Sequence, residues 1–181
     1  MHVTVEQSAT QFSGARAHGA VSAEEFKAVF RHHPGGVAVV TLATPDGPLG
    51  FTATSVISVS AAPPILAFSL ASTSSALPVM ESAESVVVNF LTDDQGTVAT
   101  QFARRGVDRF AGVEWCPLPT GEPVLAGTTG WIRGGIRDRF AVGDSMLVTV
   151  HADLTHRADD PRPLVHVNRT YHRLGGDTAL G

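Results

Sequence analysis

Small hydroxyl-bearing residues gather in one β-rich stretch of the chain, residues 50–60. Thr52, Thr54 and Ser55 stand close together there, with Ala53 among them, where a buried strand would normally carry bulky side chains. Such a surface offers backbone amides and hydroxyl groups with little steric bulk. A flat, polar, ring-shaped ligand could therefore lie against it.

A second pair of hydroxyl groups, Ser74 and Ser75, follows the next apolar run, residues 65–70. Together the two groups of hydroxyls suit a ligand that has a ring at one end and a phosphate at the other. Each group also has a simpler interpretation. Threonine and serine are common on the polar face of a solvated edge strand, and Ser74 and Ser75 could merely cap a helix.

Other kinds of chemical site find little support in the sequence. None of the eight histidines has a zinc-site spacing with a carboxylate or thiolate alongside, so no metal is expected. The glycine-rich fingerprints of Rossmann and P-loop phosphate sites are absent, as is the Gly-x-Ser-x-Gly of many hydrolases. The single cysteine, Cys116, cannot form an internal disulfide, which indicates a reducing compartment.

The composition indicates one globular, cytoplasmic domain. The chain has 181 residues, of which 43% are apolar and 17% charged, so it can bury a sizeable core. Its net charge of −4 argues against a nucleic-acid binder, and the nearest basic cluster, Arg104–Arg105 with Arg109, is interrupted by Asp108. Residues 1–20 lack the apolar core of a signal peptide, and no apolar run approaches a membrane span. We expect neither a nucleic-acid nor a membrane partner.

The hydrophobic pattern predicts strands that are joined mostly by short turns. A capping box of Ser22 and Glu25 begins a helix whose Phe26, Val29 and Phe30 share one face. Two more helices are predicted over residues 74–82 and 94–105, and strands over 37–44, 49–60, 65–70, 84–91, 131–136, 145–154 and 164–174, with a Gly/Asp/Arg loop before 145. This order favours an antiparallel barrel over a doubly wound parallel sheet.

The ordered series of motifs resembles the flavin reductase family, the small partners of two-component flavin-dependent monooxygenases. Residues 30–41 look like the family's opening helix and first strand, residues 50–64 like its flavin-binding strand, and residues 72–75 like its phosphate segment. Shorter matching pieces follow in order at 88–91, 101–103, 108–113, 121–125, 163–165 and 171–174. The resemblance covers about residues 24–175.

The resemblance implies a mainly β fold, a six-stranded antiparallel split β-barrel of Greek-key type with two or three short flanking helices. It implies a split-barrel domain over residues 21–176, between a flexible N-terminal arm at 1–20 and a C-terminal tail at 177–181. The implied reaction is hydride transfer from NADH or NADPH to FAD or FMN, with reduced flavin leaving for a flavin-dependent monooxygenase. Since the cofactors carry the reactivity, no catalytic acid or base is expected.

The resemblance also implies which residues bind the ligands. Thr52, Ala53, Thr54 and Ser55 are expected along the isoalloxazine ring, with Ser74 and Ser75 near the phosphate. The full set of expected flavin-binding residues is Phe51, Thr52, Ala53, Thr54, Ser55, Ser69, Leu70, Ala71, Ser74, Ser75, Phe102, Ala103 and Arg109.

A homodimer is expected from the same resemblance, with the flavin near the subunit interface. Phe102, Phe110, Val113 and Trp115 are more apolar than an exposed irregular segment needs. Because large exposed apolar patches tend to mark interfaces, these residues predict where the second subunit packs.

One tripeptide departs from the family's pattern. The family usually carries Gly-Asp-His before its penultimate strand, whereas this chain has Gly143, Asp144 and Ser145. That histidine is associated with the nicotinamide side of the pocket, so Ser145, together with Tyr171, is expected to face the nicotinamide. Two alternatives stay open: a flavin-storage or flavin-sensing module with little turnover, which Ser145 favours, and an enzyme like pyridoxamine phosphate oxidase.

Overall fold

The computed structural model describes residues 21–175 and divides the chain into two compact units, Met1–His32 and His33–Gly181. The arm expected at 1–20 and the tail expected at 177–181 lie outside the described residues. In the first unit, α2 (Ala23–Phe30) begins with the predicted capping box, in which Ser22 and Glu25 bond each other's side chain and backbone. None of the residues of α2 is buried, so its apolar stripe is exposed.

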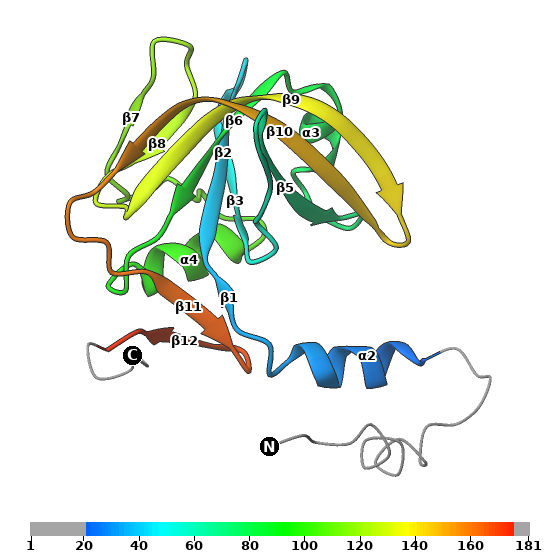
Figure 1. The fold of residues 1–181 in the computed structure, drawn as a ribbon. Coiled ribbons are helices and arrows are strands. Elements are labelled where there is room, and N and C mark those ends of the chain that lie inside the picture. The colour runs from blue at the N-terminus through cyan, green and yellow to red at the C-terminus, as the bar shows by residue number, and fades with distance from the viewer. Residues whose placement is uncertain (1–20, 176–181) are drawn as a thin grey trace. The chain divides into compact units, whose positions relative to one another are not determined.

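The second unit is built on one antiparallel sheet of seven strands (Figure 1). Their order across the sheet is β3-β2-β6-β9-β10-β5-β4, and every pairing is antiparallel. The strands are β2 (Ala38–Thr44), β3 (Gly47–Ala53), β4 (Ile57–Ala61), β5 (Pro64–Ala71), β6 (Ser85–Phe90), β9 (Gly130–Val142) and β10 (Ser145–Arg157). The mainly β, antiparallel fold expected from the sequence is confirmed, although this sheet has seven strands instead of six.

Two small sheets and two short helices complete the second unit. β1 (Gly35–Gly36) pairs with the hairpin of β11 (Leu164–Val167) and β12 (Thr170–Arg173), and β7 (Trp115–Pro117) pairs with β8 (Pro123–Leu125). The helices are α3 (Leu77–Ser82), which follows β5, and α4 (Gly96–Ala103), which follows β6. Neither these helices nor α2 is long and apolar enough to cross a membrane.

The core has two parts because β2 is buried on both faces. Ala38, Val40 and Leu42 point into a cluster that also holds the inward side chains of β3, β5, β6 and β10. Val37 and Val39 point the other way, into a smaller cluster completed by α4, Leu125 of β8 and Leu164 of β11. Successive residues of a strand face opposite sides of its sheet, so the apolar run 37–40 needs both clusters. The second cluster fixes α4 against the outer side of β2.

Residues 49–60 do not form the single strand that the sequence predicted. β3 ends at Ala53 and β4 begins at Ile57, so residues 54–56 interrupt the run. At this break the Ser55 hydroxyl accepts a hydrogen bond from the N–H of Ser69 at 2.9 Å and donates one to the Ser69 carbonyl at 3.2 Å. A side chain thus replaces the backbone pairing of a continuous strand, which periodicity alone does not reveal.

Three other predicted boundaries were wrong. The Gly/Asp/Arg stretch before residue 145 is not a loop, because β9 extends to Val142 and turns into β10 through Gly143 and Asp144. The helix predicted from residue 74 begins only at Leu77, with Pro78 in its first turn. The last predicted strand, 164–174, is a hairpin whose turn residues Asn168 and Arg169 have φ of 50° and 62°.

Candidate functional site

A polar hollow of about 230 Å³ lies between the second half of β3, the end of β5 and the C-terminal end of α4. Its walls combine hydroxyl groups, small side chains and two arginines. The lining residues are Phe51, Thr52, Ser69, Leu70, Ala71, Ser74, Ser75, Phe102, Ala103, Arg105 and Arg109. No carboxylate of the described residues lines it, so its charged groups are both cationic.

Close packing of α4 on β3 forms one wall of this hollow. A Cβ atom on Gly50 would lie 2.6 Å from Phe102 Cε1, so only glycine lets the aromatic ring approach the strand this closely. Thr52 Oγ1 donates a hydrogen bond to the carbonyl of Ala99 at 2.6 Å and ties the same strand to the helix. Phe102 is fully buried, and this anchors the end of the helix from which the arginine-bearing segment 104–109 departs.

The Arg109 guanidinium joins three elements at the cationic end of the hollow. Its Nε donates to the carbonyl of Arg104 and its Nη1 to the carbonyl of Gly50, both at 2.8 Å, and Nη2 lies 3.3 Å from Ser75 Oγ. Burial, and then repulsion from Arg105, lower the pKa of Arg109 below its usual value, although an arginine remains charged at neutral pH.

The phosphate-segment serines and threonine face these arginines. Arg105 donates from Nη2 to Thr73 Oγ1 at 3.2 Å, on the same segment that presents Ser74 and Ser75. Two guanidinium groups that repel each other, next to hydroxyl groups and with no carboxylate in the lining of this hollow, form a favourable environment for an anion. Planar guanidinium forks suit phosphate oxygens in particular.

The structure brings together most of the flavin-binding residues expected from the sequence. Those that line the hollow are Phe51, Thr52, Ser69, Leu70, Ala71, Ser74, Ser75, Phe102, Ala103 and Arg109. Arg105 also lines it and was not among the expected residues. The sequence did carry a signal for it, because Arg105 belongs to the one cluster of arginines that also contains Arg109.

Three of the expected ring-lining residues stand apart from this lining. The side chain of Ala53 is 5% exposed and points into the barrel core. Thr54 is exposed at the break after β3, and Ser55 uses its hydroxyl on the backbone of Ser69. Their contact with a flavin ring stays a prediction.

Ser145 adjoins the hollow from the neighbouring strand. It is in register with Ala71, a lining residue, and the adjacent Asp144 carbonyl accepts a hydrogen bond from the N–H of Ser72 at 2.8 Å. The Ser145 hydroxyl itself lies 3.2 Å from Asp144 Oδ1. Ser145 therefore adjoins the lining of the hollow, and its role toward a nicotinamide stays a prediction.

Tyr171 lies elsewhere, on the other side of α4. Its ring is 5.4 Å from that of His166, and it lines a separate hollow with Asp93, Asp94 and Arg104 among others. That hollow shares no lining residue with the first one. The structure thus does not bring Tyr171 and Ser145 together, and the expected nicotinamide contact of Tyr171 is untested.

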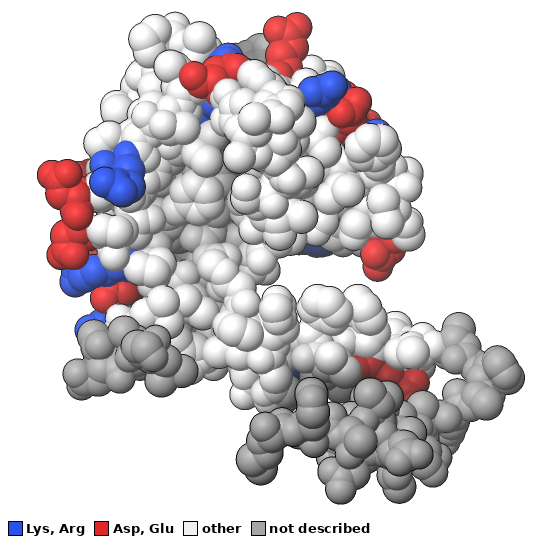
Figure 2. All heavy atoms as spheres, viewed as in Figure 1, with Lys and Arg blue, Asp and Glu red and all other residues white. Residues whose placement is uncertain are grey.

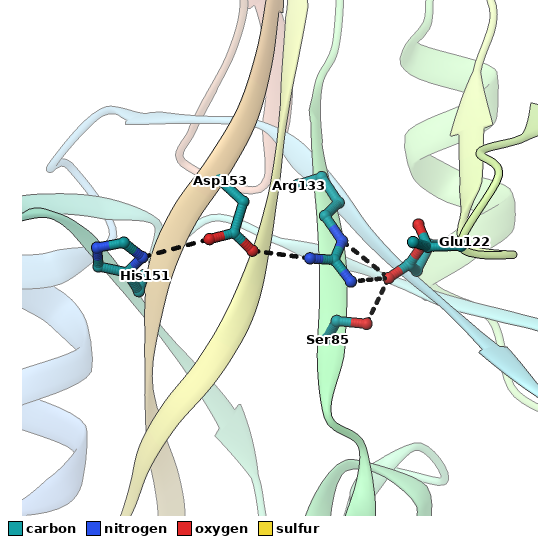
Figure 3. Close-up of polar contacts among 6 residues, drawn as sticks. Ser85, Glu122, Arg133, His151 and Asp153 are labelled. Carbon is teal, nitrogen blue, oxygen red and sulfur yellow. Dashed lines mark hydrogen bonds and ion pairs between the residues drawn. The ribbon is translucent and has the colours of Figure 1, made fainter.

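Figure 3 shows a network of ion pairs and hydrogen bonds across the sheet, and none of its residues lines the hollow. Glu122, whose side chain is 2% exposed, accepts hydrogen bonds from Ser85 and Thr120 and pairs with Arg133 at 2.9 Å. Arg133 in turn reaches Asp153 at 2.7 Å, and Asp153 lies 3.3 Å from His151. Burial opposes ionisation of Glu122, but these hydrogen bonds outweigh it and hold its pKa below the usual value.

This network is not a metal site. Among the residues that the structure describes, no group of three or more His, Cys, Asp or Glu side chains could hold a metal ion. Arg133 occupies the space between the two carboxylates that a cation would otherwise bridge. The network therefore links β9 and β10 to the segment before β8, and the groups suited to binding a ligand lie in the hollow beside Arg109.

The arrangement of strands and the hollow agree with what the chain is similar to. The model of the flavin reductase like domain matches residues 30–175. The chain belongs to this family. The barrel is accordingly the family's split barrel, with the hydroxyl-rich edges of β3 and β5 on one side of the hollow.

Individual relatives extend over nearly the same length. An NADH:FMN oxidoreductase of Rhodococcus qingshengii is 41% identical over 158 residues, which cover 84% of this chain and 82% of that protein. HsaB, the reductase subunit of a flavin-dependent monooxygenase from Rhodococcus jostii, is 27% identical over 92% of this chain and 86% of its own length. The crystal structure of a flavin reductase domain protein from Arthrobacter sp. FB24 has a TM-score of 0.80 at 34% identity, covering 85% of this chain and 96% of that one.

Proposed function

We propose that this protein is an NAD(P)H:flavin oxidoreductase that reduces FAD or FMN and supplies reduced flavin to a partner monooxygenase. The observation that carries the proposal is the hollow beside Arg109. It has a neutral, hydroxyl-rich end for a ring and a doubly cationic end for a phosphate, in a chain of the flavin reductase family. The names of the relatives, NADH:FMN oxidoreductase and a monooxygenase reductase subunit, support both halves of the proposal.

The residues of the hollow fit a flavin nucleotide chemically. Arg105 and Arg109 can neutralise a phosphate, and the hydroxyl groups of Ser74 and Ser75 can donate to its oxygens. Ser69 and Ala71 are small and exposed at the edge of β5, which leaves room for a flat ring along that strand. The absence of carboxylates from this lining, among the described residues, avoids repulsion of the phosphate.

The protein's part in the reaction is to position two rings. A bound flavin accepts a hydride from the reduced nicotinamide, so the chemistry of the transfer belongs to the cofactors. Arg109 and Arg105 hold the phosphate end and thereby fix how far the ring extends along β3 and β5. A hydroxyl donor beside the ring, such as that of Ser69, can stabilise negative charge that develops on it.

We further propose that the protein forms a homodimer, but through a different surface from the one expected. Phe102 is fully buried, and its ring packs against Phe110 at 5.0 Å, which in turn packs against Trp115 at 5.5 Å. These three rings therefore pack against one another within the second unit. The expectation that Phe102 marks an interface was wrong, because its side chain is buried where α4 packs on β3.

Within the large sheet, exposed apolar side chains lie on β4, β9 and β10, and we propose these strands as the interface. Ile57, Val59, Phe140, Val142 and Leu154 are each about half exposed or more. β4 is an edge strand, and an apolar hollow of about 480 Å³ is lined by residues of β4 and β5 together with Phe90, Ile132 and Ala152. Figure 2 shows Lys, Arg, Asp and Glu mostly along the margins of the face that it presents, with few at its centre. Exposed edges and apolar patches of this kind are typical of interfaces.

A cytoplasmic location is part of the same proposal. Cys116 is the one cysteine of the chain, and it is free and exposed. An exposed free thiol is more usual in a reducing compartment than in an oxidising one. The expected supply of reduced nicotinamide is in that compartment too.

The proposed activity can be tested with the purified full chain. NADH or NADPH is mixed with FAD or FMN, and the loss of the reduced-nicotinamide absorbance is followed. We expect multiple turnovers with at least one of the four pairs. Saturable flavin binding without oxidation of either nicotinamide would contradict the reductase and support the binding module. Absence of both binding and turnover would contradict any flavin function.

A further inference from the structure

A second hollow continues from the first one beyond Arg109. It has a volume of about 260 Å³ and is lined by Pro48, Leu49, Gly50, Ser75, Gly106, Val107, Asp108, Arg109 and Phe110. Along β3, residues 48–50 line this second hollow, whereas residues 51 and 52 line the first. Along the opposite wall, residues 106–110 line the second, whereas 102, 103 and 105 line the first. The two hollows are thus successive parts of one trough.

Ser75 and Arg109 line both hollows and so mark the point where they meet. The guanidinium of Arg109 is fixed there by the carbonyls of Gly50 and Arg104. A single phosphate would end at this point. A pyrophosphate could cross it, with one phosphate toward Arg105 and the other toward the second hollow. A cation shared by two adjoining hollows is suited to a linkage that continues through both.

The second hollow differs chemically from the first. Pro48, Leu49 and Val107 give it apolar surface, and Val107 is 47% exposed. It also contains a carboxylate, Asp108, whose Oδ1 accepts a hydrogen bond from the N–H of Phe110 at 3.0 Å. Apolar surface suits a flat base, and a fixed carboxylate suits ribose hydroxyls, as in other nucleotide sites. The same carboxylate would repel the dianionic terminal phosphate of FMN more than the singly charged phosphates of a pyrophosphate.

We propose that the second hollow receives the adenylate half of FAD, so that this protein prefers FAD to FMN. This inference rests on the proposed function, since it assigns the first hollow to the flavin and its nearer phosphate. The adenine would lie against Leu49 and Val107, the ribose hydroxyls would donate to Asp108, and the pyrophosphate would lie beside Arg109. Because NADH also carries an adenylate, the test must separate the two dinucleotides.

The test measures equilibrium binding of FAD and of FMN by titration without nicotinamide, and then KM for NADH with FMN as acceptor. Wild type should bind FAD roughly three- to thirtyfold more tightly than FMN, as one hydrogen bond and a partly buried base would give. Val107→Ala should weaken FAD about threefold and leave FMN and the KM for NADH unchanged. Asp108→Asn keeps an oxygen for Phe110 but should weaken FAD while leaving FMN equal or tighter. Val29→Ala, an exposed valine on α2, is the matched control.

A loss of FAD affinity that spares FMN in both variants would support the proposal, and a loss confined to FMN would overturn it. Equal affinity of wild type for FAD and FMN would overturn it, as would parallel losses for both flavins in Val107→Ala. A change confined to the KM for NADH would also overturn it, since the hollow would then hold the nicotinamide dinucleotide's adenylate. The binding titrations need no turnover, so failure of this inference is distinguishable from failure of the reductase activity itself.

Discussion

Arg109 Nη1 donates to the carbonyl of Gly50 at 2.8 Å across 59 positions of sequence, where the two hollows of the trough meet. Gly50 is also the residue whose missing side chain admits the ring of Phe102. Gly50 therefore contacts both elements. Its bare Cα leaves room for Phe102 of α4, and its carbonyl accepts a hydrogen bond from Arg109 in the segment that follows the helix. The position of the guanidinium depends on the strand as much as on its own loop.

Arg109→Ala should weaken flavin binding roughly tenfold to a hundredfold, because it removes a charge-assisted contact worth about 1.5–3 kcal/mol. The free energy of unfolding should also fall, since the carbonyls of Gly50 and Arg104 lose their shared donor. Arg109→Lys should recover part of the affinity, because it keeps the charge but not the planar fork. Flavin titration by fluorescence and thermal unfolding of the same samples measure both effects.

The control for Arg109 is Arg137→Ala. Arg137 is exposed and pairs only with its neighbour Asp138 at 3.6 Å, so its removal should change flavin affinity less than twofold. Equal flavin affinity of wild type and Arg109→Ala would show that the phosphate does not lie beside Arg109. Equal losses in Arg109→Ala and Arg137→Ala would point to general electrostatics of the surface.

Glu122→Gln should lower the free energy of unfolding at pH 7 by roughly 2–3 kcal/mol, because Arg133 loses its buried ionised partner. The pKa of Glu122 is lower in the folded protein than its ordinary value of 4.5. Its contribution is therefore fully present above about pH 4.5 and is lost as the pH falls through the lower, folded-state pKa. Urea unfolding between pH 3 and 7 should show the gap between wild type and variant closing in acid.

Glu114→Gln serves as the matched control for Glu122, since Glu114 is exposed. It should change the free energy of unfolding by less than about 0.5 kcal/mol at every pH. A gap between wild type and Glu122→Gln that stays constant from pH 7 to pH 3 would mean that folding does not lower the pKa of Glu122. Flavin affinity should be unaffected in both variants at pH 7, because neither side chain lines the hollow.

The proposed dimer predicts which surface of the protein forms the interface. Sedimentation at micromolar concentration should give twice the monomer mass of 19.0 kDa. Phe140→Asp, which places a charge on the apolar surface of β9, should shift the protein toward the monomer. Trp115→Ala should leave the dimer intact, because Trp115 packs against Phe110 of its own chain. Dissociation by Trp115→Ala alone would instead favour the surface that the sequence had suggested.

Local patterns in the sequence located most helices and strands but not all of the boundaries between them. The capping box of Ser22 and Glu25 was found correctly because its residues lie three positions apart in the chain. The break at Ser55 was missed because the group that replaces the strand pairing, Ser69, lies 14 positions away. The extent of β9 was missed because cross-strand pairing with β10 overrides the weak strand preference of Gly, Asp and Arg.

The candidate site was predictable where the type of a residue alone indicates what it can bind. Hydroxyls such as Ser74 and Ser75 and the arginine Arg109 were expected and line the hollow. Ala53 was expected there too, but its side chain points into the core on the same face of β3 as that of Phe51, and of these two only Phe51 also contributes to the wall. The second hollow had no sequence signal, since it forms only when residues 106–110 fold against 48–50.

Ser145 provides the sharpest test of the departure from the family's pattern. Its pairing with Ala71 places it next to the lining of the first hollow, and the family's pattern associates this position with the nicotinamide. A change there should act on the nicotinamide, which must stack on the exposed face of the flavin ring. Ser145→His should therefore lower the KM for NADH or raise turnover by roughly two- to tenfold, the size of one hydrogen bond of about 0.5–1.5 kcal/mol.

Steady-state kinetics with NADH and NADPH, and flavin titration of the same variant, separate the possible outcomes for Ser145→His. Ser145→Ala is the matched control, because it removes the hydroxyl and its bond to Asp144 without adding a ring. If Ser145→Ala leaves all constants unchanged while Ser145→His alters only the nicotinamide constants, the position faces the nicotinamide. Altered flavin affinity with unaltered NADH kinetics would place Ser145 on the flavin side instead. The imidazole ring introduced by Ser145→His, next to Ala71, would then crowd the flavin itself.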